Sequence, residues 1–217
     1  MKAAKARGAN DTDTAAALAS AREQQVATRE VLEAMSASGF DLRKVLGTIA
    51  ENAVRLCRAD NASVIRRDAA TGYEILGSAG RFEIGLDDYE RYYAGRTFQP
   101  GKGSLFGRVL LSRKTVQIED VSADPDYDPA SAPTNVPQTL LGVPIMRDAE
   151  VEGIIIVRRF NVALFSAREI EILETFSRQA AIAIENVRLF NETKEALEQQ
   201  TATADVLKTI SRSAFQP

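Results

Sequence analysis

Residues 139–159 read TLLGVPIMRDAEVEGIIIVRR, two apolar runs separated by a short charged segment. The two runs predict β-strands at 139–146 and 153–160, joined by a turn at 148–152. Nearly every position in both strands is apolar, which is typical of strands that are covered on both faces. We therefore expect this pair to occupy the middle of a sheet.

Upstream of this pair, the sequence alternates between amphipathic helices and short strands. Residues 41–58 place apolar side chains at three- and four-residue spacing, which predicts a helix that Ser38 or Asp41 could cap. A hairpin is expected next, with strands at 62–67 and 73–78. Three further elements are predicted before the central pair: short helices at 85–95 and at 104–113, the second capped by Ser104, and a short strand at 115–119.

Downstream of the pair, the sequence predicts one long helix. Ser166 and Glu169 have the spacing of a capping box, which marks its first turn. Apolar residues then recur at alternating spacings of three and four, the pattern of a two-helix seam. A helix of ~40–50 residues cannot bury such a stripe on so small a domain, so we expect a second helix as its partner and favour a parallel homodimer. The predicted dimer seam consists of Leu173, Phe176, Ala180, Ala183, Val187, Phe190 and Leu197.

The two ends of the chain carry a repeat. Residues 23–40 read EQQVATREVLEAMSASGF and residues 198–215 read EQQTATADVLKTISRSAF, with ten of the eighteen positions identical at a constant offset of 175. So many gapless identities are not explained by similar composition alone, and we expect one period of a tandem array. The chain then divides into an N-terminal tail and connector helix (1–40), a globular domain (41–168) and a C-terminal connector helix (169–217).

Composition excludes several classes of function. The chain has no histidine and one cysteine, so histidine-based metal sites, catalytic triads and disulfide frameworks are excluded. With 27 Lys and Arg against 30 Asp and Glu, the net charge of −3 gives no global attraction to nucleic acid. No apolar run approaches the ~18–20 residues of a membrane span, and no export signal is present. We expect a cytoplasmic domain without membrane contact.

Two loops have a partial likeness to ligand-binding motifs. The stretch GRTFQPGKGS at 95–104 has five residues between Gly95 and Gly101, where a phosphate-binding loop needs four. Acidic residues alternate in the loop at 121–137, but Pro129 stands where a calcium loop needs glycine. We expect a proline-stiffened loop that covers one side of the domain, and no metal ion or identifiable cofactor.

Aromatic residues concentrate between the second and third predicted strands. They suggest either the wall of a small-molecule pocket or a small core between helices and sheet, and nearby polar side chains could orient a ligand. The candidate ligand-binding residues are Arg81, Phe82, Tyr92, Phe98, Phe106, Tyr127 and Thr139.

Three other side chains have two interpretations each. Arg158 and Arg159 end a predicted strand, where alternate residues face opposite ways, so only one of them could line an anion site. We expect solvated arginines instead. Cys57 ends a helix on its apolar side and is expected to be a buried, unreactive thiol rather than a nucleophile.

The sequence resembles the GAF domain family over about residues 41–193, most closely the tandem modules of bacterial sensor histidine kinases. The resemblance implies an α+β fold with a central antiparallel sheet of five or six strands and helices on both faces. Long connector helices would flank it. The entry and exit helices would pack on one face of the sheet, with a ligand pocket on the other beneath 81–113. The stretches that carry it are GSLFGRVLLSRKTVQIEDV (103–121), DPDY (124–127), the strand pair at 139–159, and FSAREIEILETFSRQAAIAIENVRLFNET (165–193).

Functional residues of some relatives are incomplete in this chain. Cyclic-nucleotide-binding members of the family carry an Asn-Lys…Phe…Asp-Glu set. Asn161, Phe165 and Glu169 stand at comparable positions here, but Val162 replaces the lysine and Ile170 the second acid. The resemblance therefore disfavours cyclic nucleotides. It also disfavours photoreceptor and reductase roles, because those relatives use histidine or several cysteines.

The resemblance implies a regulatory, non-enzymatic domain of a bacterial signal-transduction protein. A small molecule would shift the packing of dimeric connector helices and so act on an output domain outside this chain. One alternative is a ligand-free dimerisation and relay spacer, in which the space beneath Phe82–Phe106 is filled by its own side chains. A cyclic-nucleotide-binding domain is the other. The expected partners are a second copy and adjacent domains of a longer chain.

Overall fold

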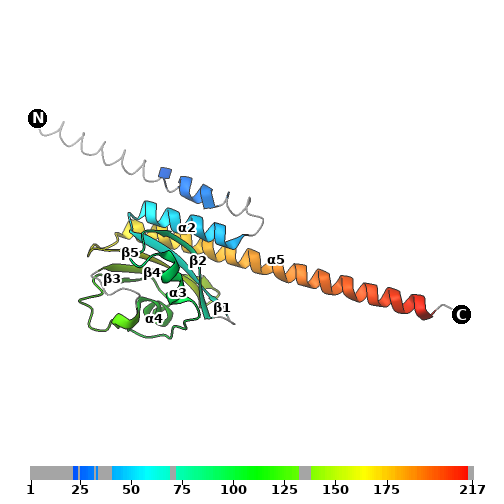
Figure 1. Ribbon diagram of the computed structural model, residues 1–217. Helices are drawn as coiled ribbons and strands as arrows, with labels where there is room; N and C mark the ends of the chain where they lie inside the picture. Colours follow the sequence, from blue (N-terminus) through cyan, green and yellow to red (C-terminus); the bar gives the residue numbers. More distant parts are fainter. Residues whose placement is uncertain are drawn as a thin grey trace, which may run out of the picture.

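The computed structural model describes residues 22–23, 25–31, 33, 41–68, 72–131 and 138–214, with side chains to residue 203. A single sheet is flanked by helices, and its last helix projects far beyond it (Figure 1). The elements are α2 (Leu42–Leu56), β1 (Asn61–Asp68), β2 (Gly72–Gly80), α3 (Leu86–Tyr93), α4 (Leu105–Ser112), β3 (Val116–Ile118), a 3-10 turn (Pro129–Ser131), β4 (Thr139–Arg147), β5 (Glu150–Arg159) and α5 (Ala167–Ala214).

The sheet has five antiparallel strands in the order β2-β1-β5-β4-β3. The two apolar runs within residues 139–159 form the hairpin β4–β5. Strand β1 joins this hairpin along β5, where Asn61 pairs with Arg158. The predicted α+β fold is confirmed with five strands. The predicted division of the chain at 40/41 and 168/169 stays a prediction, and much of residues 1–40 lies outside the described residues.

Helices cover the two faces of the sheet unequally. The long helices α2 and α5 lie on one face, and the short helices α3 and α4 lie on the other (Figure 1). Because side chains alternate along a strand, β5 sends Ile155 and Val157 toward α2 and α5, and Ile154 and Ile156 toward α3 and α4. We call these the connector face and the pocket face.

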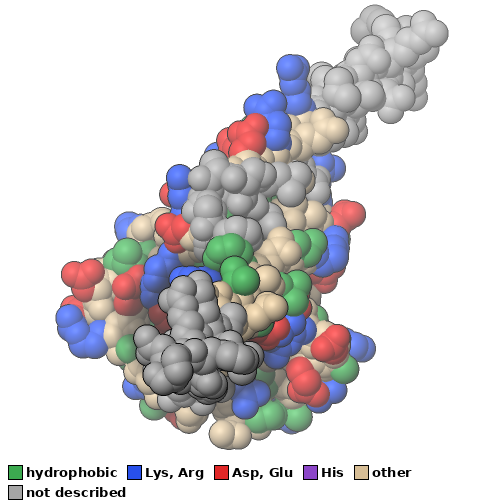
Figure 2. Space-filling model, turned by 90° about the vertical axis from the view of Figure 1, so that its right-hand side faces the viewer, with side chains coloured by type: hydrophobic (Ala, Val, Ile, Leu, Met, Phe, Trp, Pro, Cys, Tyr) green, Lys and Arg blue, Asp and Glu red, His purple; other side chains and the backbone are tan. Residues whose placement is uncertain are grey.

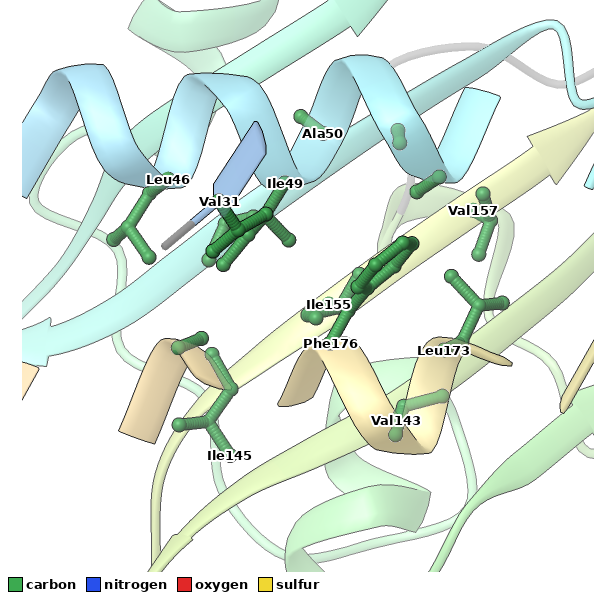
Figure 3. Close-up of a cluster of buried hydrophobic side chains, with 14 of the residues drawn as sticks. Val31, Leu46, Ile49, Ala50, Val143, Ile145, Ile155, Val157, Leu173 and Phe176 are labelled. Atoms are coloured by element: carbon green, nitrogen blue, oxygen red, sulfur yellow. The ribbon is translucent and has the colours of Figure 1, made fainter. Parts of the chain in front are cut away.

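The connector face is a dense apolar core. Figure 3 shows Leu46 and Ile49 of α2 facing Phe176 of α5 across Ile155 of the sheet. Val31, from the first copy of the repeat, is also fully buried in this cluster. Apolar burial of this kind is the main driving force of folding, so α2 and the first part of α5 are integral to the domain.

The contact between α2 and the sheet depends on a glycine. A Cβ atom on Gly77 of β2 would lie 2.4 Å from the backbone of Leu46. Only glycine therefore lets the helix approach the strand so closely.

Local signals identified the start of three helices, and of the two caps proposed for the first, Asp41 forms the bond while Ser38 lies outside the described residues. Asp41 Oδ1 accepts a hydrogen bond from the Lys44 amide at 3.2 Å, and Ser104 Oγ accepts one from the Gly107 amide at 2.9 Å. The predicted capping box forms as well, because Glu169 Oε2 accepts from the Ser166 amide at 2.7 Å. These bonds satisfy amides that have no partner within their own helix.

The predicted dimer seam is wrong for its first four residues. Leu173, Phe176 and Ala180 are 0% exposed and Ala183 is 3% exposed, because α2 and the chain's own sheet cover them. Val187 is partly buried against the same cluster. A stripe that the domain already buries cannot line an interface with a second copy, whereas the last two predicted residues, Phe190 and Leu197, are 44% and 62% exposed.

Other surface features are unremarkable. Acidic and basic side chains are interspersed over the end of the molecule toward which α5 projects (Figure 2). None of the helices among the described residues is long and apolar enough to cross a membrane.

Candidate ligand-binding site

A small cavity lies on the pocket face, between the sheet, α4 and the loop that follows β3. Its volume is about 20 Å³, enough for about one water molecule. Five of its lining residues are polar: Tyr93, Ser104, Tyr127, Ser131 and Arg158. The apolar part of the lining is formed by Phe98, Leu105, Phe106, Leu140 and Ile156.

Aromatic rings build the wall of this cavity. Phe98 stacks on Phe106 with ring centroids 4.4 Å apart, and Tyr73 of β2 lies edge-on to Phe106 at 4.5 Å. Tyr89 and Tyr93, one turn apart on α3, continue the cluster with centroids 4.9 Å apart. Such offset and edge-on contacts are favourable between rings, so the wall is well packed without a ligand.

Arg158 is the charged group of the site. It is 5% exposed, although it lies on the same face of β5 as the apolar residues Ile154 and Ile156. Its Nη2 donates to the Tyr93 hydroxyl at 2.9 Å, and its guanidinium lies 4.7 Å from the centre of the Tyr89 ring. Among the described residues, its Nε has no hydrogen-bond partner. A buried cation normally has an anionic partner, and the aromatic contacts compensate only in part.

Further polar atoms are buried on this face without a partner among the described residues. Asn61 Oδ1 and Ser78 Oγ are among them, and the buried Ser63 and Tyr89 hydroxyls interact with each other. Asn61 lies directly across from Arg158 in the pairing of β1 with β5, and Ser63 follows two residues later on the same face. Burial raises the pKa of Tyr89 and of Tyr127, so both phenols are neutral at physiological pH. The tyrosines therefore supply hydroxyl groups but no negative charge to Arg158.

The loop at 121–131 closes the cavity and is held at three points. Arg108 of α4 forms a bidentate ion pair with Asp124, with N–O distances of 2.6 and 2.9 Å. The Tyr92 hydroxyl donates to the Ala130 carbonyl at 2.8 Å, and Ser131 Oγ donates to the Gly103 carbonyl at 3.1 Å. Hydrogen bonds from Arg108 hold the pKa of Asp124 below its ordinary value. The loop predicted to cover one side of the domain therefore covers this site.

The predicted ligand-binding residues divide into three groups. Phe98, Phe106 and Tyr127 line the cavity. Phe82 and Tyr92 lie behind the wall, where Phe82 contacts Tyr89 at 4.6 Å between centroids.

The structure contradicts the two remaining assignments. Arg81 is a surface side chain, 73% exposed and 3.4 Å from Asp60. Thr139 lies on the same side of β4 as Leu141, within the connector face. Its hydroxyl donates to the Glu119 carbonyl at 2.6 Å and accepts from the Ala163 amide at 2.9 Å, so a ligand could not use it.

Arg158 is the residue that sequence reasoning undervalued. Strand alternation indicated that Arg158 and Arg159 face opposite sides, but both were expected to be solvated. Arg159 is in fact mostly buried, with its side chain 13% exposed on the connector face, where it donates to Glu169 Oε1 at 2.5 Å and to the Cys57 carbonyl at 2.7 Å. The available signal was the position of both arginines at the end of a strand otherwise apolar on both faces.

A larger hollow of about 690 Å³ lies elsewhere, between the β3–β4 edge and α5. It is an open surface groove, lined by apolar residues such as Pro144 and Ile182 and by Arg113, Lys114 and Arg178. Small-molecule sites are usually enclosed, so the cavity on the pocket face is the better candidate.

A family model described as a GAF domain matches residues 41–185. The chain belongs to the GAF domain family. This membership agrees with the resemblance seen in the sequence and with the five-stranded antiparallel sheet.

Solved structures share this GAF fold. One is the GAF domain of an Acinetobacter phosphoenolpyruvate-protein phosphotransferase, with 20% identity, TM-score 0.60, and coverage of 76% of this chain and 95% of that chain. Another is a bacteriophytochrome from the photosynthetic bacterium R. palustris, with 13% identity, TM-score 0.61, and coverage of 86% and 41%. A segment of a methyl-accepting chemotaxis protein matches with 19% identity, TM-score 0.55, and coverage of 75% and 98%. At these identities the likeness concerns the fold alone.

The residues that stand in place of the cyclic-nucleotide set have structural roles in this GAF domain. Phe165 is 3% exposed and lies under the Arg159 guanidinium, 4.1 Å from its ring centre. Glu169 holds Arg159 and caps α5. Both side chains belong to the connector face and are therefore unavailable to a ligand in the cavity.

Cys57 is buried beside the same ion pair. Burial, with a smaller contribution from Glu169, raises the pKa of its thiol to about 12. A thiol with so high a pKa is protonated at neutral pH and is a poor nucleophile.

Proposed function

We propose that this GAF domain is a small-molecule sensor that relays the state of its pocket through α2 and α5 to an output domain outside this chain. The buried, uncompensated Arg158 beside an enclosed cavity carries the proposal. Retaining such a charge lowers stability, and perturbed, partly satisfied polar groups of this kind concentrate at functional sites.

Arg159 provides a physical route from the pocket to the helices. It follows Arg158 directly in β5 and binds the Cys57 carbonyl at the end of α2 and Glu169 in the first turn of α5. A ligand that moved Arg158 perpendicular to the sheet would also shift Arg159. Through Arg159 it would shift the end of α2 and the start of α5. Relay requires that the ligand prefer one of two helix arrangements.

The relay is proposed to act through a homodimer. The exposed apolar residues Ile182, Leu189 and Leu197 are separated by seven and eight residues, close to two helical turns each, so they lie on one side of α5. This stripe replaces the predicted seam, four residues of which are covered by the domain itself. A sensor histidine kinase in the bacterial cytoplasm is the context that we propose for the full protein.

The domain itself is proposed to be non-enzymatic. The high pKa of Cys57 weighs against thiol chemistry, and within the described residues no three acidic or cysteine side chains are grouped to hold a metal ion. A regulatory role needs no reacting group, only a site whose occupancy changes the structure.

A ligand-free relay spacer is the second candidate, and the small volume of the cavity favours it. Native mass spectrometry of the freshly purified chain separates the two. Extra small-molecule mass on the wild type supports the sensor. Bare polypeptide mass, with no ligand recovered from a metabolite extract, supports the spacer and overturns the sensor.

The dimer has its own test. Leu189→Asp should give a monomer in light scattering, because it places a charge in the proposed stripe. Asn191→Asp is the matched control, since Asn191 is exposed on the opposite side of α5. A dimer that survives Leu189→Asp overturns the stripe, and a monomeric wild type overturns the dimer.

A further inference from the structure

We infer that the pocket selects an organic anion, and that the anion is a carboxylate whose charge is bound by Arg158. This inference rests on the proposed sensor function and deepens it. Two adjacent arginines differ in their partners. Arg159 has a carboxylate partner, Glu169, at 2.5 Å, whereas no ion pair joins Arg158 to an acidic side chain of the described residues.

The free part of the guanidinium is suited to a carboxylate. Tyr93 accepts from only one of the two N–H groups of Nη2, and Nε is buried with no partner among the described residues, so Nε–H and the second Nη2–H remain as a pair. A planar guanidinium presents its N–H groups as a fork that matches the two oxygens of a carboxylate. A neutral ligand would leave the buried charge uncompensated, so binding of an anion is favoured by the charge itself.

The surroundings supply the remaining contacts. Arg158, Tyr127 and Ser131 all line the cavity, and the Phe98 and Phe106 rings form its apolar wall. A carboxylate placed at Arg158 would direct its carbon body toward those rings. The cavity of about 20 Å³ holds only about one water molecule. The body of the ligand therefore has to displace the loop at 121–131, which the Arg108–Asp124 pair holds closed.

Ligands with one body and different head groups test this inference. We would titrate the full chain with benzoate, phenyl phosphate and benzamide, and with acetate as the head group alone, and measure binding by calorimetry and thermal shift. Benzoate should bind at least about tenfold more tightly than benzamide, the factor that one charge-assisted hydrogen bond supplies. Phenyl phosphate should bind more weakly than benzoate.

Arg158→Met should abolish the preference for benzoate over benzamide. Arg158→Lys keeps the charge without the fork and should retain only part of it. Arg81→Met is the matched control, because it removes one arginine from the exposed surface and should leave all affinities unchanged. If Arg158→Met fails to fold, the Arg158→Lys titration answers the same question.

Three outcomes overturn the inference: equal affinity for benzoate and benzamide, a preference for benzoate that survives Arg158→Met, or no binding of any of the three anions at 10 mM. Tighter binding of phenyl phosphate would replace the carboxylate with a phosphate. The outcome for the sensor function is separate. If native mass spectrometry finds a neutral molecule whose occupancy is unchanged in Arg158→Met, the anion inference is overturned and the sensor function is supported.

Discussion

The two faces of the sheet solve the same packing problem differently. On the connector face, long helices bury a continuous apolar cluster. Arg159 lies on this face and has the Glu169 carboxylate and the Cys57 and Leu164 carbonyls as partners. On the pocket face, short helices and a loop cover Arg158, whose charge has no such compensation. The first face is built for stability. The second retains an unfavourable charge, which points to selection for something other than stability.

The largest expected effect concerns the connector face. Phe176→Ala removes a ring that is 0% exposed and should lower the free energy of unfolding by about 3–5 kcal/mol. Urea titration followed by circular dichroism measures it, with the midpoint shifted and the slope unchanged. Phe98→Ala, at a half-buried ring of the pocket face, should cost clearly less. Equal losses would contradict the difference between the faces.

The next largest effect should come from Arg159. Arg159→Met leaves Glu169 without its cation at a site where the two side chains are 13% and 18% exposed. Loss of a partner from a mostly buried pair should cost about 2 kcal/mol, less than for a fully buried one. The double variant Arg159→Met/Glu169→Gln removes the unpaired charge but keeps an oxygen for the α5 cap, and it should regain part of that loss. If it is no more stable than the single variant, the pair is not what holds this corner together.

Arg158→Met, unlike Arg159→Met, should not lower the free energy of unfolding. Replacing a buried, uncompensated cation with an apolar side chain of similar length should leave stability unchanged or raise it by about 1 kcal/mol. The same urea titration, without added ligand, measures it. A loss as large as that of Arg159→Met would mean that Arg158 is a structural residue, and the comparison of the two arginines would fail.

Local structure could be predicted from the sequence because its causes are local. The caps at Ser104 and Ser166, and the five strands, follow from side chains that act on their own backbone or alternate between two faces. The periodicity of α5 also identified the correct stripe, Leu173 to Ala183, as its buried side. It could not say what buries that stripe, because a sheet and a second helix both satisfy the same spacing.

The candidate site was harder to predict, for a related reason. Aromatic density grouped Phe98, Phe106 and Tyr127, which do line one cavity, because bulky rings cluster wherever a small core forms. That they bind a ligand stays a prediction. Arg81 and Thr139 were misplaced, since their roles depend on which face and which edge the tertiary fold gives them. The burial of Arg158 is set by α3 and α4, elements distant in sequence that fold over the strand.

A smaller effect is expected where the loop closes the pocket. Arg108 lowers the pKa of Asp124, so the pair stabilises the fold above the ordinary carboxyl pKa and the effect is lost as the pH falls through the lowered pKa. Asp124→Asn should therefore lower the melting temperature at pH 7, by the equivalent of about 1 kcal/mol or less, and the gap should close in acid. Asp126→Asn, at the exposed pair with Lys102, is the control. A gap independent of pH would contradict the assignment.

The smallest effect on stability, and the most local readout, is expected at Cys57. Its pKa of about 12 and its burial mean that a thiol reagent such as DTNB should label the native chain only when the connector face opens. The raised pKa also predicts that stability falls as the pH rises above 9.0, the ordinary value for this thiol, because unfolding then releases a proton. Arg159 binds the Cys57 carbonyl, so Arg159→Met should speed labelling at pH 8, whereas Arg158→Met should not. Equal acceleration by both variants would show that the two faces open together. The faces would then differ in the partners of their arginines but not in how they open.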